Sequence, residues 1–308
     1  MTLAEVIGIF LSLKKNSGLN YVSQSRIMRV FGERHAGKDI SDITQDDVRA
    51  YVESREHTYK RNYFQQLSLF FNWAVQAEYL DFSPMWEKSI FPPPQCPYIY
   101  TGDEIKRLLD AASRRKSHNS RLQAEMFRTI LLTTYACGLR IGEARRLKCR
   151  DIDFERNTLV ILDSKFHGSR FTPFSDDFAH ILKEYYSQRI RIAPMPEEMG
   201  SALFPTRTGY AVSLDRLEKI FRELRKEAGI PRTGGYGPRI HDLRHSFAVH
   251  AMTDAYRRGE NAPEFLYRLS VYLGHASIEG TRRYLTLTPE LRAAGYKLYE
   301  DYQKKTEK

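Results

Sequence analysis

Cysteine is scarce in this chain of 308 residues, and long apolar runs and internal repeats are absent. The three cysteines, Cys96, Cys137 and Cys149, are odd in number and show no CxxC spacing, so neither a disulfide framework nor a zinc ribbon is indicated. No stretch approaches the ~18 consecutive apolar residues that a membrane helix needs. A GxxxxGK[ST] loop for nucleotide phosphates is also missing. We therefore expect no membrane partner and no ATP-dependent chemistry.

Composition and length indicate a globular protein with more than one domain. Hydrophobic residues make up 42% and charged residues 28% of the chain, which excludes wholesale disorder. Domains usually have about 100–200 residues, so this length favours two of them. In residues 1–15 the lysines follow the apolar run, and no small-residue cleavage site comes next. This pattern predicts an amphipathic helix of a cytoplasmic protein rather than a signal peptide.

The net positive charge of the chain falls entirely in its later part. Residues 1–95 contain 11 basic and 11 acidic residues, so the net charge of +10 belongs to residues 96–308. A basic surplus confined to one region suggests a polyanionic partner, because each neutralised phosphate releases condensed counterions. Charge alone is equally compatible with a soluble basic protein that binds no polyanion.

Three consecutive prolines mark a boundary between two parts of the chain. The segment Ser89-Ile-Phe-Pro-Pro-Pro-Gln-Cys-Pro97 cannot continue a helix or a central strand. The shift in charge falls at the same place. We therefore predict a helical domain at 1–88, a proline-rich linker at 89–99 and a second domain at 100–308.

The first domain is predicted to be a small all-α bundle, and the second to be mainly α with one small antiparallel β-sheet. Tyr63–Leu80 carries an apolar stripe wide enough for a buried helix, and Thr44 and Thr101 are typical helix N-caps. A β-rich run followed by the turn Gly168-Ser169 predicts a hairpin. Further helices are expected at about 121–137, 176–191, 213–228, 241–256, 263–273 and 278–285.

Two segments of the second domain combine charged side chains at helical spacing. Arg140 follows a helix-ending glycine, and Glu143 comes three residues later, where one helical turn joins them. A carboxylate beside an arginine fixes the fork that grips a phosphate with two hydrogen bonds. In the segment His241-Asp-Leu-Arg-His-Ser-Phe-Ala248, His241, Arg244 and His245 share one helical face. Taken alone, the first pair would more often be an ordinary surface ion pair.

A zinc site at His241 and His245 is disfavoured. Two histidines four residues apart resemble half of a metal site, but a metalloprotease helix needs HExxH with glutamate as general base. Here Asp242 occupies the glutamate position, and the cationic Arg244 lies between the imidazoles. We therefore expect no metal and no other cofactor.

Two further segments supply groups that can move protons or attack phosphorus. Lys165 lies in the predicted hairpin turn, together with His167 and Arg170. His275 follows Tyr272-Leu-Gly, and Tyr284 comes nine residues after His275 in the helix that Ser277 is expected to cap. Arginines can neutralise charge on non-bridging phosphate oxygens, and a tyrosine hydroxyl can form a covalent phosphoester. Together these side chains predict metal-free phosphoryl transfer to a tyrosine.

The ordered set GLRIGE, Lys165, HDLRH, LGH and a tyrosine nine residues on resembles the tyrosine recombinase (phage integrase) family. The resemblance covers 99–290, and more weakly residues 1–95, which look like the family's core-binding domain. It implies the following roles. The scissile phosphate is held by Arg140 and Arg244 and attacked by Tyr284. Proton transfer and hydrogen bonding fall to Lys165, His241 and His275, with Glu143 and His245 in supporting positions.

The resemblance implies a site-specific recombinase that cuts double-stranded DNA at its recombination site through a 3′-phosphotyrosyl intermediate and a Holliday junction. Four protomers would act together on DNA in the bacterial cytoplasm, exchanging an amphipathic C-terminal helix that starts at about 290. An accessory recombinase or an element-encoded partner is compatible with this scheme. The length before the linker favours a simple recombinase or a mobile-element transposase over a large phage integrase. The alternatives are a type IB topoisomerase and a DNA-binding regulator that does not cleave.

Overall fold

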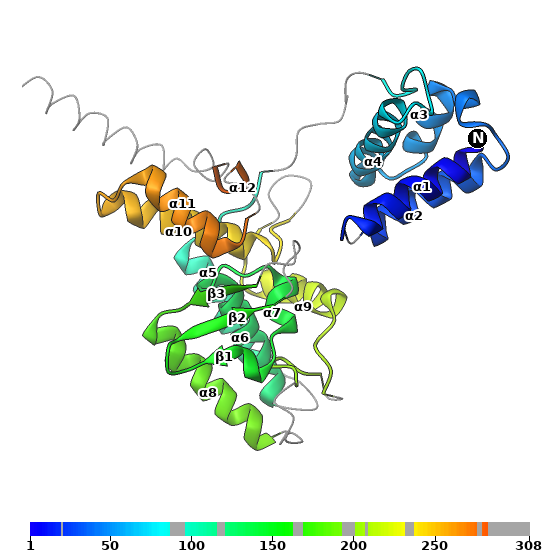
Figure 1. Cartoon of the computed structure of the whole chain (residues 1–308). Helices are drawn as coiled ribbons and strands as arrows, with labels where there is room; N and C mark the ends of the chain where they lie inside the picture. The colour runs from blue at the N-terminus through cyan, green and yellow to red at the C-terminus, as the bar shows by residue number, and fades with distance from the viewer. Residues whose placement is uncertain are drawn as a thin grey trace, which may run out of the picture. The chain divides into compact units, whose positions relative to one another are not determined.

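The computed structural model describes residues 1–19, 21–86, 96–115, 121–162, 169–192, 201–206, 209–231, 237–275 and 279–282. The chain divides into two compact units, Met1–Gln95 and Cys96–Lys308, which are coloured in sequence order in Figure 1. The division falls within the segment predicted as a linker, at 89–99. Each unit has its own buried core, so each is considered separately.

The first unit is helical throughout its described residues. Its elements are α1 (Leu3–Asn16), α2 (Val22–Arg34), a 3-10 turn (Ile40–Asp42), α3 (Gln45–Glu53) and α4 (His57–Gln76). Thr44 caps α3 as predicted, because its hydroxyl accepts from the Asp47 amide and the Asp47 carboxylate accepts from the Thr44 amide. Helix α4 begins six residues before the predicted Tyr63, because the polar residues ahead of the apolar stripe contain no helix breaker.

Aromatic rings make up much of the core of the first unit. Phe10, Phe31, Phe70 and Phe71 are fully buried. The rings of Phe10 and Phe70 pack edge to face with centroids 5.6 Å apart, an arrangement worth about 0.5–1.5 kcal/mol beyond burial alone. This unit therefore does not depend on its connection to the rest of the chain for a hydrophobic core.

The second unit is mainly helical with one three-stranded antiparallel sheet, as predicted. Its helices are α5 (Gly102–Arg114), α6 (Arg121–Ala136), α7 (Ile141–Arg146), α8 (Asp176–Ile192), α9 (Leu214–Glu227), α10 (Asp242–Arg257), α11 (Ala262–Leu273) and α12 (Glu279–Arg282). Thr101 caps α5 through a capping box with Glu104. The predicted helix that ends at Gly138 corresponds to α6, and Gly138 has the left-handed φ of 57° that terminates such a helix.

The sheet consists of β1 (Ile152–Asp153), β2 (Thr158–Ile161) and β3 (Arg170–Pro173), in that order. The predicted hairpin corresponds to β2 and β3, and its register pairs Ile161, the last residue of β2, with Arg170, the first residue of β3. The short helix α7 and the two-residue strand β1 were not predicted, because neither is long enough to show a periodic apolar pattern. Residues 163–168, which include Lys165, lie outside the described part of the chain.

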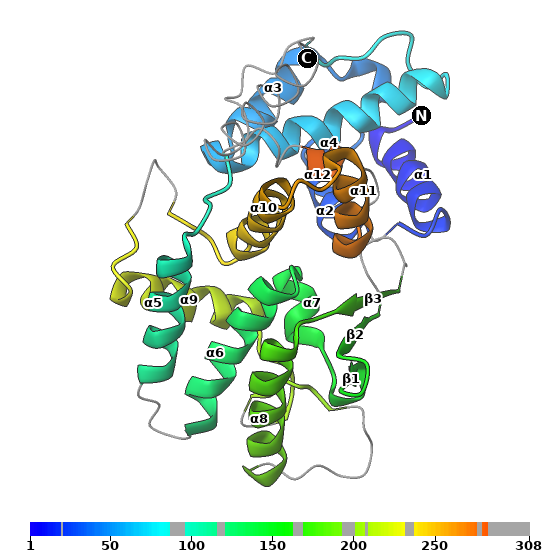
Figure 2. The ribbon, with the colours of Figure 1, turned by 90° about the vertical axis from the view of Figure 1, so that its left-hand side faces the viewer.

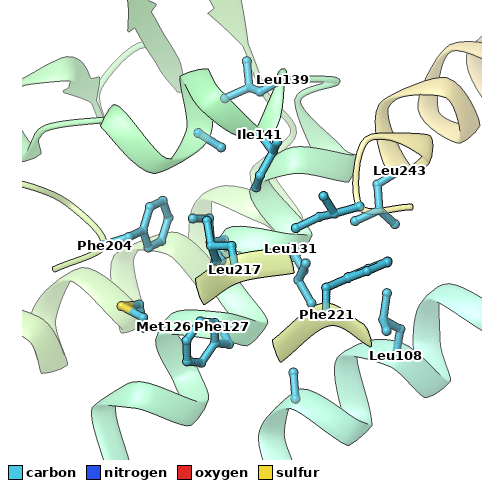
Figure 3. Packing of buried hydrophobic residues seen from close by; sticks show 14 of the residues in the cluster. Leu108, Met126, Phe127, Leu131, Leu139, Ile141, Phe204, Leu217, Phe221 and Leu243 are labelled. Carbon is cyan, nitrogen blue, oxygen red and sulfur yellow. The ribbon is translucent and has the colours of Figure 1, made fainter. Parts of the chain in front are cut away.

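Helices from distant parts of the sequence close the core of the second unit. Figure 2 shows α6 between α5 and α8, and α6 also packs against α10. In Figure 3, Leu108 of α5, Phe127 and Leu131 of α6, Phe221 of α9 and Leu243 of α10 converge on one buried cluster. This packing fixes the start of α10 against the end of α6, where the candidate site residues lie. No helix in the described ranges is long and apolar enough to cross a membrane.

Candidate active site

Arg140 and Glu143 are joined across the first turn of α7. The Glu143 carboxylate accepts hydrogen bonds from the Arg140 backbone amide at 2.9 Å and from Arg140 Nη1 at 2.8 Å. Arg140 Nη2 donates to the carbonyl oxygen of Gly274 at 3.1 Å. The Glu143 side chain is only 3% exposed, whereas that of Arg140 is 24% exposed. The buried carboxylate thus fixes a guanidinium that still reaches solvent.

A second arginine, Arg170 at the start of β3, binds the same carboxylate. Its Nη1 and Nη2 donate to the two Glu143 oxygens at 3.1 and 2.8 Å, and its Nε donates to the carbonyl oxygen of Tyr272 at 3.0 Å. This is the two-point geometry that makes arginine–carboxylate pairs strong. Arg170 was predicted to lie in the hairpin, but its partner was not predicted.

A third arginine, Arg244 on α10, lies behind the other two and is buried, with 1% of its side chain exposed. Its Nη1 donates to the carbonyl oxygen of Gly138 at 2.9 Å, and its Nη2 donates to that of Leu273 at 2.7 Å. Nη1 is also 3.8 Å from Glu143 Oε2. Direct contact between Arg244 and a DNA phosphate therefore requires the groups that cover it to move.

Two glycines supply carbonyl oxygens to these arginines, and both have a left-handed backbone. Gly138 has φ 57°, and a Cβ there would lie 2.5 Å from Phe247 Cδ1. Gly274 has φ 65°, and a Cβ there would lie 3.1 Å from Arg170 Cδ and Nη1. Glycine is needed at both positions because the chain turns sharply where side chains pack closely. The ends of α6 and α11 are thereby held against the arginine cluster.

The arginines determine the charge state of Glu143. Burial raises the pKa of this carboxyl, but hydrogen bonds and charge from Arg170, with hydrogen bonds from Arg140, outweigh burial and lower the pKa to about 2. Glu143 is therefore ionised at neutral pH. Three guanidinium groups and one carboxylate leave a surplus of positive charge, which suits an anionic phosphate.

His241 precedes α10 and packs against His245. The two imidazoles meet edge to face with centroids 4.9 Å apart. The pKa of His241 is lowered to about 4, mainly by burial. The positive charges of Arg244, Arg239 and Arg140 also lower this pKa, and together they outweigh the opposite effect of Asp242. His241 is thus neutral at pH 7 and can accept a proton. His245 is buried, with 3% of its surface exposed.

Asp242 holds the turn that carries His241. Its carboxylate accepts from the Arg239 amide at 2.8 Å and from Arg239 Nη2 at 2.9 Å. The Asp242 side chain is buried, and Arg239 is largely exposed. This ion pair was not predicted, although an acidic residue in the first turn of a helix is a recognisable signal.

His275 lies immediately after Gly274, close to the arginine cluster. Its Nδ1 forms a 2.6 Å hydrogen bond with Thr281 Oγ1 of α12, and Thr281 is fully buried. The same turn therefore supplies a carbonyl oxygen to Arg140 and the imidazole of His275. Arg140, Arg244 and His275, which are far apart in the sequence, are brought together around Gly274.

A sequence model of the phage integrase family matches residues 99–290. The chain belongs to the phage integrase family. Within this integrase domain, the predicted residues Arg140, Glu143, Arg244 and His275 converge on one region, and His241 and His245 open the helix that carries Arg244.

Curated relatives of this chain include proteins from Sinorhizobium fredii. "Putative integrase/recombinase y4rB" is 33% identical over 204 residues, which is 63% of either chain, so the match spans less than two thirds of that relative. A second protein of this species, y4rE, is 30% identical over 79% of this chain and 75% of the relative. Tyrosine recombinase XerD of Neisseria meningitidis is 26% identical over 81% of this chain and 80% of the relative.

Solved integrase structures share the fold. The Tn1549 transposon integrase in complex with transposon right end DNA matches with a TM-score of 0.71 and 18% identity, over 97% of this chain and 100% of the other. A lambda integrase dimer bound to a COC' core site matches with a TM-score of 0.61 and 18% identity, over 90% of this chain and 96% of the other. These similarities bear on fold alone.

Two predicted catalytic residues of this chain, Lys165 and Tyr284, lie outside the described residues, as do Ser277 and the predicted C-terminal helix. Their roles stay predictions. In the parts of the chain that the structure describes, His, Cys, Asp and Glu side chains do not gather in groups that could hold a metal ion. The signal that could have revealed the Arg170–Glu143 pair is an arginine at an inward-facing position of a strand, since Arg170 and the buried Thr172 lie on the same face of β3.

Proposed function

We propose that this integrase is a site-specific DNA recombinase that cuts and rejoins double-stranded DNA through a covalent bond to Tyr284. The observation that carries the proposal is the cluster of Arg140, Arg170 and Arg244 around the single carboxylate of Glu143, in a chain of this family. Such a cluster has the charge to bind a phosphodiester and to stabilise the extra negative charge of its transition state.

Arg140 is the arginine best placed to meet the scissile phosphate. Its guanidinium is partly exposed, and Glu143 and the Gly274 carbonyl fix its orientation. Arg244 adds positive charge from behind and reaches the phosphate once the groups covering it move. His275, held by Thr281, would donate a hydrogen bond to a non-bridging oxygen from its other ring nitrogen.

The proposed cleavage is a transfer between two oxygen atoms. The Tyr284 oxygen attacks phosphorus, its proton passes to the neutral His241, and the bond from phosphorus to the 5′ oxygen breaks. Lys165 gives a proton to the departing 5′ oxygen. The product is a 3′-phosphotyrosyl ester and a free 5′-hydroxyl. Attack by a 5′-hydroxyl reverses these steps, so rejoining needs neither ATP nor an external phosphate donor.

The proposed assembly on DNA contains four protomers that exchange strands through a Holliday junction and trade their C-terminal helices. The partner is double-stranded DNA that carries a specific site, and the enzyme acts where bacterial DNA is found. Related proteins named as transposon integrase and as XerD suggest transposition and recombination between sites as roles of this kind. The site cluster is compatible with each of these roles.

Tyr284→Phe tests the chemistry. DNA sites would first be selected by affinity from random duplexes, and then given a nick next to the scissile position so that the 5′-hydroxyl fragment diffuses away. We expect the parent to accumulate an SDS-resistant protein–DNA adduct and Tyr284→Phe to bind equally well without forming one, because only the nucleophilic oxygen is lost. Tyr267→Phe, at an exposed tyrosine of α11, is the matched control and should react like the parent.

The same assay separates the alternatives. Excess EDTA should leave adduct formation unchanged, because the proposed reaction uses arginine, histidine, lysine and tyrosine alone. Loss of the adduct with EDTA and recovery with magnesium or zinc would overturn the proposed site. Relaxation of supercoiled DNA without strand exchange would indicate a type IB topoisomerase. Tight binding without any adduct from the parent would indicate a non-cleaving regulator.

A further inference from the structure

Arg170 connects strand β3 to two segments that carry candidate catalytic residues. Its two Nη atoms bind both oxygens of Glu143, next to Arg140 on α7. Its Nε binds the carbonyl oxygen of Tyr272, three residues before His275. Arg170 itself is the first residue of β3. All three of its guanidinium nitrogens are thus engaged within the protein.

The packing around Arg170 is as close as its hydrogen bonding. Its side chain is 10% exposed. Gly274, whose carbonyl accepts from Arg140, lies so near that a Cβ would be 3.2 Å from Arg170 Cζ. Each nitrogen of this guanidinium thus already donates to a group of the protein. This arrangement does not fit a role for Arg170 as the general acid in place of Lys165.

The charges around Glu143 indicate a different role. Glu143 is the carboxylate that Arg140 contacts, at 2.8 Å. If Arg170 were absent, the buried carboxylate would keep its 2.8 Å bond to Arg140 and its longer 3.8 Å contact with Arg244, so Arg140 would offset more of its negative charge. With Arg170 present, one positive charge offsets Glu143 and the positive charge of Arg140 remains for a ligand. The carboxylate can then orient Arg140 without cancelling its charge.

We propose that Arg170 is a positioning residue that neutralises Glu143, so that Arg140 keeps its full positive charge for the scissile phosphate. This inference rests on the proposed strand cleavage. A purely structural role explains the pair less well, because buried ion pairs can often be replaced by well-packed apolar residues at little or no cost in stability. The pair is better explained by the charge that it leaves on Arg140.

The test uses Arg170→Met, Glu143→Gln and the double variant Arg170→Met/Glu143→Gln. Methionine has a similar length without charge, and glutamine removes the charge of Glu143 while keeping its shape. Adduct formation on the nicked duplex is measured in single turnover with saturating enzyme. We expect Arg170→Met to slow it by about 10- to 100-fold, as is usual for partners that orient active-site groups. The double variant should be at least several-fold faster than Arg170→Met, because the uncompensated carboxylate is gone.

Two controls separate this role from loss of folding. Arg189→Met removes another buried arginine of the same unit, which hydrogen-bonds Ala202 and Ser201, and should leave the rate of the folded enzyme unchanged. Arg170→Lys keeps the charge without the two-point geometry and should fall between the parent and Arg170→Met. Thermal unfolding shows which variants fold. A double variant no faster than Arg170→Met, or a lysine variant no faster than the methionine one, would overturn the charge role.

A second readout does not depend on cleavage. The Glu143 carboxyl can be titrated by NMR in the DNA-free protein, and its pKa should be higher in Arg170→Met than in the parent, because burial then opposes fewer hydrogen bonds and less positive charge. An unchanged pKa would refute the proposal even if the parent forms no adduct. The parent protein could also fail to form an adduct while the Glu143 pKa rises in Arg170→Met as expected. That result would contradict the proposed function but would still show that Arg170 offsets the charge of Glu143.

Discussion

At the scale of single residues, Glu143 and His241 show how burial and charge oppose each other in one site. Glu143 is buried yet ionised, because arginines on α7 and β3 donate to both of its oxygens. His241 is partly buried and neutral, because burial and the neighbouring arginines disfavour a further positive charge. The same cluster therefore contains a fixed anion, Glu143, which orients the arginines, and a neutral base, His241.

The low pKa of His241 predicts a pH-dependent loss of stability. The ordinary pKa of a histidine is 6.5, and the pKa of His241 in the folded chain is about 4. As pH falls from 6.5 towards 4, the unfolded chain takes up a proton that the folded chain refuses, so the free energy of unfolding decreases. The full effect is about 3 kcal/mol, at about 1.36 kcal/mol per pKa unit.

Chemical denaturation of the parent and of His241→Gln between pH 7 and pH 4 measures this effect. The difference between the two unfolding free energies isolates His241 from the other groups that titrate over this range. We expect the parent to lose stability relative to the variant as pH falls. A constant difference would show that His241 titrates near its ordinary value.

At the scale of helices and strands, the site depends on where α6 and α11 end. Gly138 and Gly274 terminate these helices with left-handed backbones and direct their carbonyl oxygens at Arg244 and Arg140. The chain ends each helix where the arginine cluster needs an acceptor. Helix termination and site geometry are therefore set by the same residues.

Gly138→Ala tests this coupling. The new Cβ would meet Phe247 Cδ1 at 2.5 Å and Leu273 Cδ2 at 2.9 Å, in addition to the strain of a positive φ. We expect a loss of about 2–5 kcal/mol in unfolding free energy, the sum of left-handed strain and overpacking. Gly259→Ala is the matched control, because Gly259 ends α10 with φ 71° and has open space around it, so only the strain of about 1–2 kcal/mol applies. Equal losses in the two variants would show that the close packing at Gly138 is unimportant.

Elements with a local signal could be predicted from the sequence, and those set by tertiary contacts could not. The caps at Thr44 and Thr101, the end of α6 at Gly138 and the β2–β3 hairpin each follow from nearby residues. The motifs around Arg140 and Arg244 could be recognised, but their convergence on Gly274, Gly138 and Glu143 joins segments more than 100 residues apart. The contact of Arg170 with Glu143 could not be predicted either, because β3 and α7 meet only in the folded chain.

At the scale of the whole chain, charge and core are distributed differently between the two units. Residues 1–95 have no net charge but form a complete aromatic core, whereas residues 96–308 carry the whole surplus of +10 together with a core of their own. The second unit therefore combines a hydrophobic core of its own with the positive charge that the proposed DNA partner requires. A neutral bundle can still bind DNA when its basic side chains lie on one face, and its tether makes that second contact effectively intramolecular.

Removal of residues 1–95 measures the contribution of the first unit. We expect the 96–308 fragment to bind site-bearing DNA about a hundredfold more weakly than the full chain, the lower end of the usual gain from linking two binding modules. The plot of log affinity against log salt should also become less steep, because fewer phosphates are neutralised. Fluorescence anisotropy at several salt concentrations gives both quantities, and cooperative thermal unfolding confirms that the fragment is folded. An affinity and a salt slope equal to those of the full chain would show that residues 1–95 do not touch DNA, and would confine binding to the unit that carries the arginine cluster.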